Sequence, residues 1–307
     1  MKTSIQTKMG GKEWLMLIVL SVFWGGSFFF VEIALEELPT LTIVALRVAI
    51  AAIVLWGVVL SLNLNVSKSP KLWFSFILMG LLNNAIPFSL ITWGQTQIIS
   101  SLASILNAAM PFFTIIVARL LLPDEKVSVL KVAGVVIGFT GVTVMIGLPE
   151  TTEGLMVLAQ LAILAAGLSY AVASAYGRRF REIGINPIVL AAGQTGASSL
   201  IMLPIALSID GAPDVNTLSI ESMLSIFSLA VFSTAIAYVL YFKILASSGA
   251  VNISLVTLLV PVSAILLGVV VLGESLEMIH IIGMAIIALG LITIDGRLLN
   301  YKGLKKT

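Results

Sequence analysis

Apolar residues run along most of the chain in blocks of about twenty, separated by short polar breaks. Blocks of this length match a bilayer, because a helix of about 20 residues crosses its roughly 30 Å hydrocarbon core. Proline and glycine mark most of the breaks, whereas those at 97–98 and 246–249 are weakly marked. We predict ten membrane-spanning helices, at about 14–34, 41–61, 73–96, 99–121, 129–148, 155–177, 187–207, 222–245, 250–272 and 279–295.

The chain also contains an internal repeat. Shifting the first copy by 150 positions aligns Asn84 with Thr234, Phe88 with Tyr238, Asn107 with Thr257 and Pro111 with Pro261. After a gap of one residue, Glu125, Gly134 and Gly141 align with Glu274, Gly283 and Gly290. Each repeat holds five predicted helices, and an odd number makes the two repeats cross the membrane in opposite directions. Inverted repeats of this kind place substrate sites near the midplane, between the two halves. The alternative is that the duplication only built a stable helical scaffold.

Composition supports a membrane protein and excludes several kinds of site. Hydrophobic residues make up 59% of the chain and charged residues 10%, whereas soluble domains carry about 25% charge. The net charge of +2 gives no reason to expect nucleic acid as a partner. The sequence has no cysteine and one histidine, His280, so we predict no metal site, no catalytic residue and no cofactor. The expected partners are the lipid bilayer and a small-molecule substrate, and one copy of the chain is compatible with this organisation.

The basic residues predict the orientation of the chain. When the loops are assigned alternately to two sides, sixteen of the seventeen lysines and arginines fall on the side of the N-terminus. Because lysine and arginine favour the cytoplasmic side, we expect both termini in the cytoplasm and a plasma (inner) membrane location. The predicted segments are a cytoplasmic stretch 1–13, a first repeat 14–148, an external linker 149–154, a second repeat 155–295 and a basic cytoplasmic tail 296–307.

Several short motifs resemble those of one transporter family. They are Phe23-Trp24-Gly25-Gly26-Ser27-Phe28 in the first helix, Leu46-Arg47 in the second, Leu121-Leu122-Pro123-Asp124-Glu125 leading to Gly134, and Leu272-Gly273-Glu274 leading to Gly283. Together they resemble the drug/metabolite transporter superfamily in its ten-helix EamA-type branch, over residues 14–295. The resemblance implies export or exchange of small metabolites, often amino acids. Leu168-Ser169-Tyr170 departs from it, because many members have tryptophan there.

The candidate substrate site follows from helical spacing and repeat matching. Residues 84, 88, 92 and 95 share one face of a helix, and residues 234, 238 and 241 do the same. Unpaired amides are costly in lipid, so these side chains should face protein or water. Polar contacts between helices, or core packing of the aromatic rings, are the alternatives. The candidate residues are Trp24, Asn84, Phe88, Gln95, Asn107, Tyr170, Tyr238, Tyr241 and Thr257.

Two prolines and two charges complete the prediction. Pro111 and Pro261 lie in the interiors of predicted helices, where proline removes a backbone hydrogen bond, and they are candidate hinges. Arg47 and Glu32 are charges inside predicted helices, and we expect a structural ion pair or an outer gate. Binding of a substrate carboxylate by Arg47 is the alternative. The glycines at 134, 138, 141, 283 and 290 predict close helix packing.

The sequence therefore predicts an all-α integral membrane protein of ten helices, in two inverted five-helix repeats, and this pairing favours a transporter that works by alternating access. The resemblance implies that it exports or exchanges amino acids or related metabolites. An intramembrane enzyme is the first alternative, and it would need a nucleophile–base pair, a metal cluster or a carboxylate pair near the midplane. The second alternative is a membrane sensor without transport, which usually carries a soluble domain. The longest polar segment here is only about a dozen residues.

Overall fold

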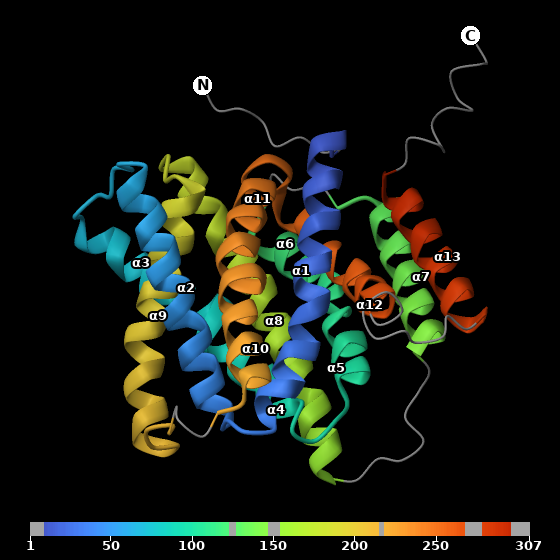
Figure 1. The fold of residues 1–307 in the computed structure, drawn as a ribbon. Coiled ribbons are helices and arrows are strands. Elements are labelled where there is room, and N and C mark those ends of the chain that lie inside the picture. Colours follow the sequence, from blue (N-terminus) through green and yellow to red (C-terminus); the bar gives the residue numbers. More distant parts are fainter. Residues whose placement is uncertain (1–8, 123–126, 147–153, 215–217, 268–277, 296–307) are drawn as a thin grey trace, which may run out of the picture.

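The computed structural model describes residues 9–122, 127–146, 154–214, 218–267 and 278–295. Every regular element in these ranges is helical, and the helices form one bundle (Figure 1). The α-helices are α1 (Gly11–Leu35), α2 (Thr40–Ser61), α3 (Pro70–Gly80), α4 (Ile86–Gly94), α5 (Ser100–Asn107), α6 (Met110–Leu121), α7 (Val129–Ile146), α8 (Gly154–Glu182), α9 (Pro187–Ile209), α10 (Ile220–Ala230), α11 (Ala237–Ser254), α12 (Val256–Leu267) and α13 (Met278–Asp295). Two π-helical segments, η1 (Leu81–Ala85) and η2 (Val231–Ile236), join α3 to α4 and α10 to α11.

These elements supply ten crossings. Seven helical stretches are long and apolar enough to span a membrane, and three shorter apolar helices, Val129–Val144, Val256–Leu267 and Met278–Ile294, complete the set. The two weakly marked breaks are both present. The third crossing, which consists of α3, η1 and α4, ends at Gly94, and the fourth begins with α5 at Ser100. The long α11 is interrupted at Gly249, whose φ of 84° lies in the left-handed region that glycine adopts without strain.

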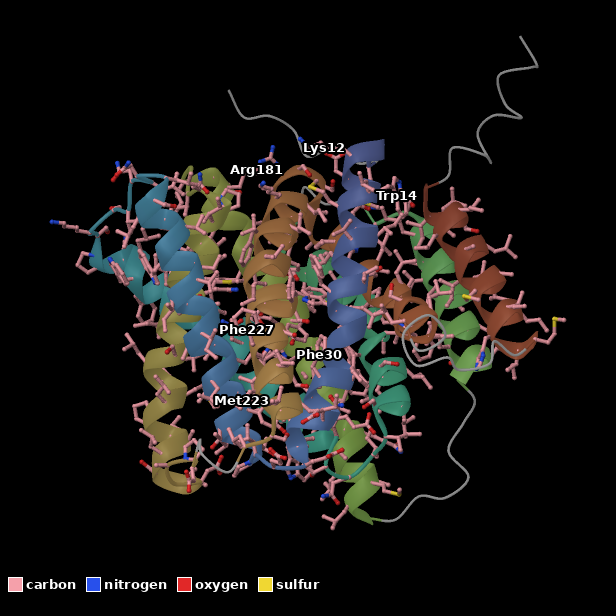
Figure 2. All side chains as sticks on the ribbon, in the orientation of Figure 1. Lys12, Trp14, Phe30, Arg181, Met223 and Phe227 are labelled. Atoms are coloured by element: carbon pink, nitrogen blue, oxygen red, sulfur yellow. The ribbon has the colours of Figure 1, made fainter. Side chains whose placement is uncertain are left out.

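The outer surface of the bundle matches a lipid environment. Large apolar side chains are exposed along it, among them Phe227 and Met223 of α10, which are 51% and 46% exposed. Figure 2 shows both residues on the face of the bundle turned to the viewer. Apolar side chains on the outside are what hydrocarbon requires, because lipid tails solvate them as well as a protein core does. The chain is therefore an all-α integral membrane protein, as the sequence predicts.

Helix packing is preserved when the two repeats are exchanged. The α3 helix packs on α9 as α10 packs on α2, and α6 packs on α8 as α12 packs on α1. The two largest interfaces, α2 with α9 and α7 with α13, each join a helix to its own counterpart. The π-helical segments also correspond, since η1 and η2 begin 150 positions apart at Leu81 and Val231. The fold is thus two five-helix repeats related by a pseudo-two-fold axis and inverted in the membrane.

Glycines allow the close approach of α7 and α13. A Cβ on Gly141 would lie 2.7 Å from the backbone nitrogen of Ile287, and a Cβ on Gly290 would lie 2.6 Å from the carbonyl oxygen of Gly134. Neither backbone atom can move without separating the helices. The predicted role of these glycines in packing is confirmed, whereas a Cβ on Gly138 would meet only the side chain of Leu258, at 3.0 Å.

Charged groups mark the two ends of the bundle. Lys12 and Arg181 lie at the end where α1 begins and α8 ends (Figure 2). At the other end, Asp210 Oδ2 accepts hydrogen bonds from the backbone N–H and hydroxyl of Thr42, at 2.8 and 3.0 Å.

Glu37 connects two further elements at that second end. It lies between α1 and α2, and its carboxylate accepts a bond of 2.9 Å from the N–H of Ser219, which precedes α10. This bond, with the hydroxyls of Ser219 and Ser222, holds the pKa of the Glu37 carboxyl below its usual range. The charged form of Glu37 therefore holds the first repeat to the second.

Some predicted features lie outside the described ranges. These include residues 1–8 of the N-terminal stretch, Glu125, Glu274, the tail 296–307 and all of the linker 149–154 except Gly154. The prediction that Pro111 lies in the interior of a helix is wrong. This residue is the second of α6, and the chain turns at Ala108 and Ala109 just before it. Since the first turn of a helix has no internal N–H partner, Pro111 removes no helical hydrogen bond. Pro261 does lie inside its helix, α12.

Candidate functional site

A cavity lies among the helices of both repeats. Its empty volume is about 620 Å³, including the part that is open to solvent. Helices α1, α2, α4, α5, α6 and the η1 segment contribute from the first repeat, and α8, α11 and α12 contribute from the second. The lining residues are Trp24, Ser27, Phe28, Val31, Arg47, Asn83, Phe88, Ile91, Thr92, Gln95, Asn107, Met110, Tyr170, Tyr238, Tyr241 and Thr257.

Aromatic rings form much of the wall. Phe88 stacks on Tyr238 with ring centroids 6.5 Å apart and planes 12° apart. Trp24 contacts Tyr241 with centroids 5.7 Å apart, and Tyr241 contacts Tyr238 at 6.2 Å. Hydrogen bonds fix these rings, because Trp24 Nε1 donates to the carbonyl oxygen of Ser233 at 3.2 Å and the hydroxyls of Tyr241 and Ser174 share a bond of 2.7 Å. The wall is therefore apolar and held in place.

Eight of the nine candidate substrate residues line this cavity, and Asn84 is the exception. Asn84 is completely buried, its Nδ2 donates to Ser198 Oγ at 2.7 Å, and its Oδ1 accepts from the Tyr238 hydroxyl at 2.5 Å. The neighbouring Asn83 lines the cavity in its place. The π-helical turn of η1 explains the shift, because it adds a residue and puts residues five apart, 83 and 88, on one face.

Arg47 is the one charged side chain among the described residues that line the cavity. It lies in α2, is 6% exposed, and its Nε donates to Thr234 Oγ1 at 2.8 Å. Its Nη2 donates to the carbonyl oxygen of Ser233 at 3.4 Å, and the guanidinium lies over the ring of Phe88, 3.7 Å from the centroid.

The predicted ion pair between Arg47 and Glu32 is wrong. Glu32 is exposed near the end of α1, and its carboxylate accepts a hydrogen bond from the hydroxyl of Ser100 at the start of α5. Arg47 instead points toward η2 of the second repeat. Within the part of the chain that the structure describes, no carboxylate pairs with Arg47. A buried cation with hydrogen bonds but no counter-ion therefore faces the cavity.

Two amide oxygens beside the cavity also lack partners. Gln95 Nε2 donates to the carbonyl oxygen of Phe28 and to Ser100 Oγ, both at 3.0 Å, while Gln95 Oε1 has no partner. Because a backbone carbonyl only accepts, this contact fixes which end of the Gln95 amide is oxygen. Asn107 is 7% exposed, and its Oδ1 also lacks a partner. Buried acceptors are rarely left unpaired, so both are suited to a donor that enters the cavity.

The other lining residues were missed, although the sequence carried a signal for some of them. Ser27, Phe28 and Val31 lie three, four and seven residues after Trp24, which is the spacing of one helical face. Ile91 lies three residues after Phe88 and Met110 three residues after Asn107, so both carry the same signal, whereas Asn83 carries none. Thr92 lies on the predicted face of its helix and lines the cavity as expected.

The side chains that line the cavity are of kinds that bind small molecules. No cluster of three or more histidine, cysteine, aspartate or glutamate side chains occurs in the described ranges. The lining offers one guanidinium, several amides and hydroxyls, and aromatic faces. Such a site binds an anionic or polar group at one side and an apolar body at the other.

Comparisons with known proteins agree with this architecture. A family model described as the EamA-like transporter family matches residues 12–147 and 157–294, so each match covers one repeat. A crystal structure with 20% sequence identity superposes with a TM-score of 0.76, covering 96% of this chain and 99% of that one. At this identity, the likeness shows the fold alone.

Three curated relatives are similar over nearly the whole chain. The uncharacterized transporter YoaV of Bacillus subtilis is 24% identical, over 91% of this chain and 95% of its own length. The uncharacterized inner membrane transporter YedA of Escherichia coli K12 is 27% identical, over 91% and 89%. A protein of Salmonella typhimurium named as a probable amino-acid metabolite efflux pump is 24% identical, over 92% and 94%.

Proposed function

The chain belongs to the EamA-like transporter family, and we propose that it exports or exchanges amino acids or related small metabolites by alternating access. One observation carries the proposal: an apolar cavity with a few placed polar groups lies between two inverted repeats. Inverted repeats place binding sites at their interface, and rocking of one half against the other opens the site to each side in turn. The Salmonella relative named for amino-acid efflux supports the substrate class.

The residues proposed to bind the substrate come from both repeats. Tyr170, Tyr238 and Tyr241, together with Trp24 and Phe88, provide faces for an apolar body. Three polar side chains, Gln95, Asn107 and Thr257, line the same space and orient the polar groups. We assign Asn84 to the interface between η1 and α9 instead, because its amide is fully engaged there.

We also propose where the helices bend, which contact acts as a gate and which side of the membrane the termini face. Pro261 in α12 and the paired η1 and η2 segments are the proposed points of bending, because each departs from α-helical hydrogen bonding. The contact between Glu32 and Ser100 joins α1 to α5 beside the lining residues Phe28 and Gln95, and we propose that it acts as a gate. We propose that both termini face the cytoplasm of a plasma-membrane protein, because lysine and arginine favour the cytoplasmic side and sixteen of the seventeen fall on the predicted side of the N-terminus.

Transport rather than catalysis is the proposed activity. The lining residues within the described ranges include no acid, histidine or cysteine that would serve as a nucleophile or a general base. A transporter needs none of these groups, since it only binds the substrate and changes conformation.

Flux into liposomes that contain only the purified protein tests this function. We expect saturable uptake of at least one member of a panel of labelled amino acids and related metabolites, with none into protein-free liposomes. Tyr170→Ala should reduce the uptake, because Tyr170 lines the cavity. Tyr176→Ala is the matched control, since Tyr176 lies in the same helix but packs on Phe180 outside the cavity. Absence of flux for the whole panel would refute the proposal.

A further inference from the structure

We propose that Arg47 binds the carboxylate of the substrate, so that the cavity takes compounds with an amino-acid-like carboxylate and excludes the corresponding amides and amines. The proposal rests on the transport function above and specifies the chemistry that its site selects. It starts from the contacts of one side chain that the transporter fold brings to the centre of the bundle.

The hydrogen bonds of Arg47 leave part of its guanidinium available. Nε and Nη2 donate to groups of η2, and no hydrogen bond within the described ranges involves Nη1. Phe88 covers one face of the planar group at 3.7 Å. A carboxylate binds a guanidinium along its edge, in the plane, so the stacked ring leaves that approach open. Nε and Nη2 are therefore held by η2, while Nη1 has no hydrogen-bond partner within the described ranges and Arg47 lines the cavity.

The second repeat shows that the fold does not require a cation at this position. Helices α2 and α9 begin at Thr40 and Pro187, and the same shift of 147 places Gln194 at the position of Arg47. Gln194 contacts Asn83 of η1, as Arg47 contacts Ser233 of η2. A neutral amide thus completes one copy of this interface, while the other copy carries a charge. Packing therefore does not explain the positive charge of Arg47, whereas an anionic substrate in the cavity would.

The remaining polar groups fit the rest of an amino acid. Gln95 Oε1 and Asn107 Oδ1 are acceptors without partners, and an ammonium or other N–H donor would supply what they lack. The aromatic rings beside them accept either an apolar side chain or the face of a cation. A compound with a carboxylate, an N–H donor and an apolar body would therefore satisfy every unpaired group named here.

Calorimetric titration of the purified full-length chain in detergent tests the carboxylate requirement without any mutation. The probes are the twenty common L-α-amino acids, followed by the amide and the decarboxylated amine of the tightest binder. We expect the amide and the amine to bind at least about tenfold more weakly, because a charge-assisted hydrogen-bonded pair is lost. Equal binding of the acid and its amide, or no binding by any of the twenty, would overturn the proposal.

Variants assign the selectivity to Arg47. In Arg47→Gln, the preference for the acid over its amide should disappear, and Arg47→Lys should restore part of it by restoring the charge. Arg179→Gln is the matched control, because Arg179 also stacks on an aromatic ring, Tyr176, at 4.7 Å, but is exposed outside the cavity. Retention of the full preference in Arg47→Gln would overturn the assignment. If Arg47→Gln does not fold, the acid–amide comparison on the unmodified chain decides.

The liposome assay separates this proposal from the transport function. Flux of a compound without a carboxylate, unchanged by Arg47→Gln, would keep the transport function and remove the role of Arg47. Absence of flux for every compound would remove the transport function itself.

Discussion

Phe88 and Tyr238 occupy the same position in the two repeats, and their rings stack on each other with centroids 6.5 Å apart. A residue and its own repeat counterpart meet only where the pseudo-two-fold axis passes. Both rings also line the cavity, so the cavity lies on this axis. The cavity that we propose as the substrate site therefore lies between the two halves of the duplication.

Backbone contact between α7 and α13 predicts a strong effect of adding one methyl group. Gly141→Ala places a Cβ 2.7 Å from the Ile287 nitrogen and should lower the unfolding free energy by about 1–3 kcal/mol. Gly57→Ala is the control, since a Cβ there meets nothing within 4 Å and alanine favours the helix. Thermal unfolding in detergent measures both variants. An equal melting temperature for the two would contradict the packing described here.

The two asparagines of the predicted site should behave differently. Asn84→Ala removes an amide that bonds Ser198 and Tyr238, and it should lower stability by about 1–3 kcal/mol. Asn107→Ala removes an amide whose oxygen has no partner, so it should leave the melting temperature nearly unchanged and weaken transport. Unfolding and liposome flux are measured on the same preparations. Full transport activity in folded Asn107→Ala would remove Asn107 from the site.

Because of Glu37, we expect the stability of the folded protein to fall at acid pH. Its folded pKa is lowered by the Ser219 N–H, so its contribution is fully present above the unfolded pKa, about 4.3, and is lost as pH falls through the folded value. Glu37→Gln should therefore be less stable than the parent at neutral pH and converge with it below that range. Melting temperatures measured from pH 7 to pH 3 give both curves. Parallel curves over the whole range would show that the carboxylate is not coupled to folding.

Reporter fusions test the orientation. A reporter joined after Lys71 should be cytoplasmic and one joined after Asp214 external, because sixteen of seventeen basic residues fall on the first side. Fusions that report the same side would overturn the ten-helix topology.

Much of the fold could be predicted because lipid constrains it. A helix must be apolar over a fixed length, and the repeat supplies each boundary twice. Gly249 illustrates this, since the second copy carries a glycine at a break that the apolar pattern alone marks weakly. The position of Pro111 could not be predicted in the same way, because the turn before it consists of two alanines, Ala108 and Ala109, which carry no turn signal.

Two features of the candidate site could not be predicted from the sequence. The choice of Asn84 over Asn83 assumed regular α-helical spacing, and the π-helical turn of η1 shifted the face by one residue. The sequence suggests a pair of Arg47 with Glu32 because both are charges inside predicted helices. The structure turns them in different directions, and only packing between α2 and η2 decides that. Depth along a helix can be predicted from the sequence, but its rotation about its axis depends on its neighbours.

The central claim is that the cavity between the repeats opens to both sides of the membrane in turn. The chain has no cysteine, so Ser27→Cys places a single thiol in the cavity lining. Ser198→Cys is the control, because Ser198 of α9 is fully buried against Gly80 of α3 and does not line the cavity. The experiment treats right-side-out and inside-out vesicles with a membrane-impermeant thiol reagent.

We expect the reagent to modify Ser27→Cys from both sides, more slowly when a transported substrate is present, and not to modify Ser198→Cys. Modification of Ser27→Cys from one side only, with and without substrate, would contradict alternating access through this cavity.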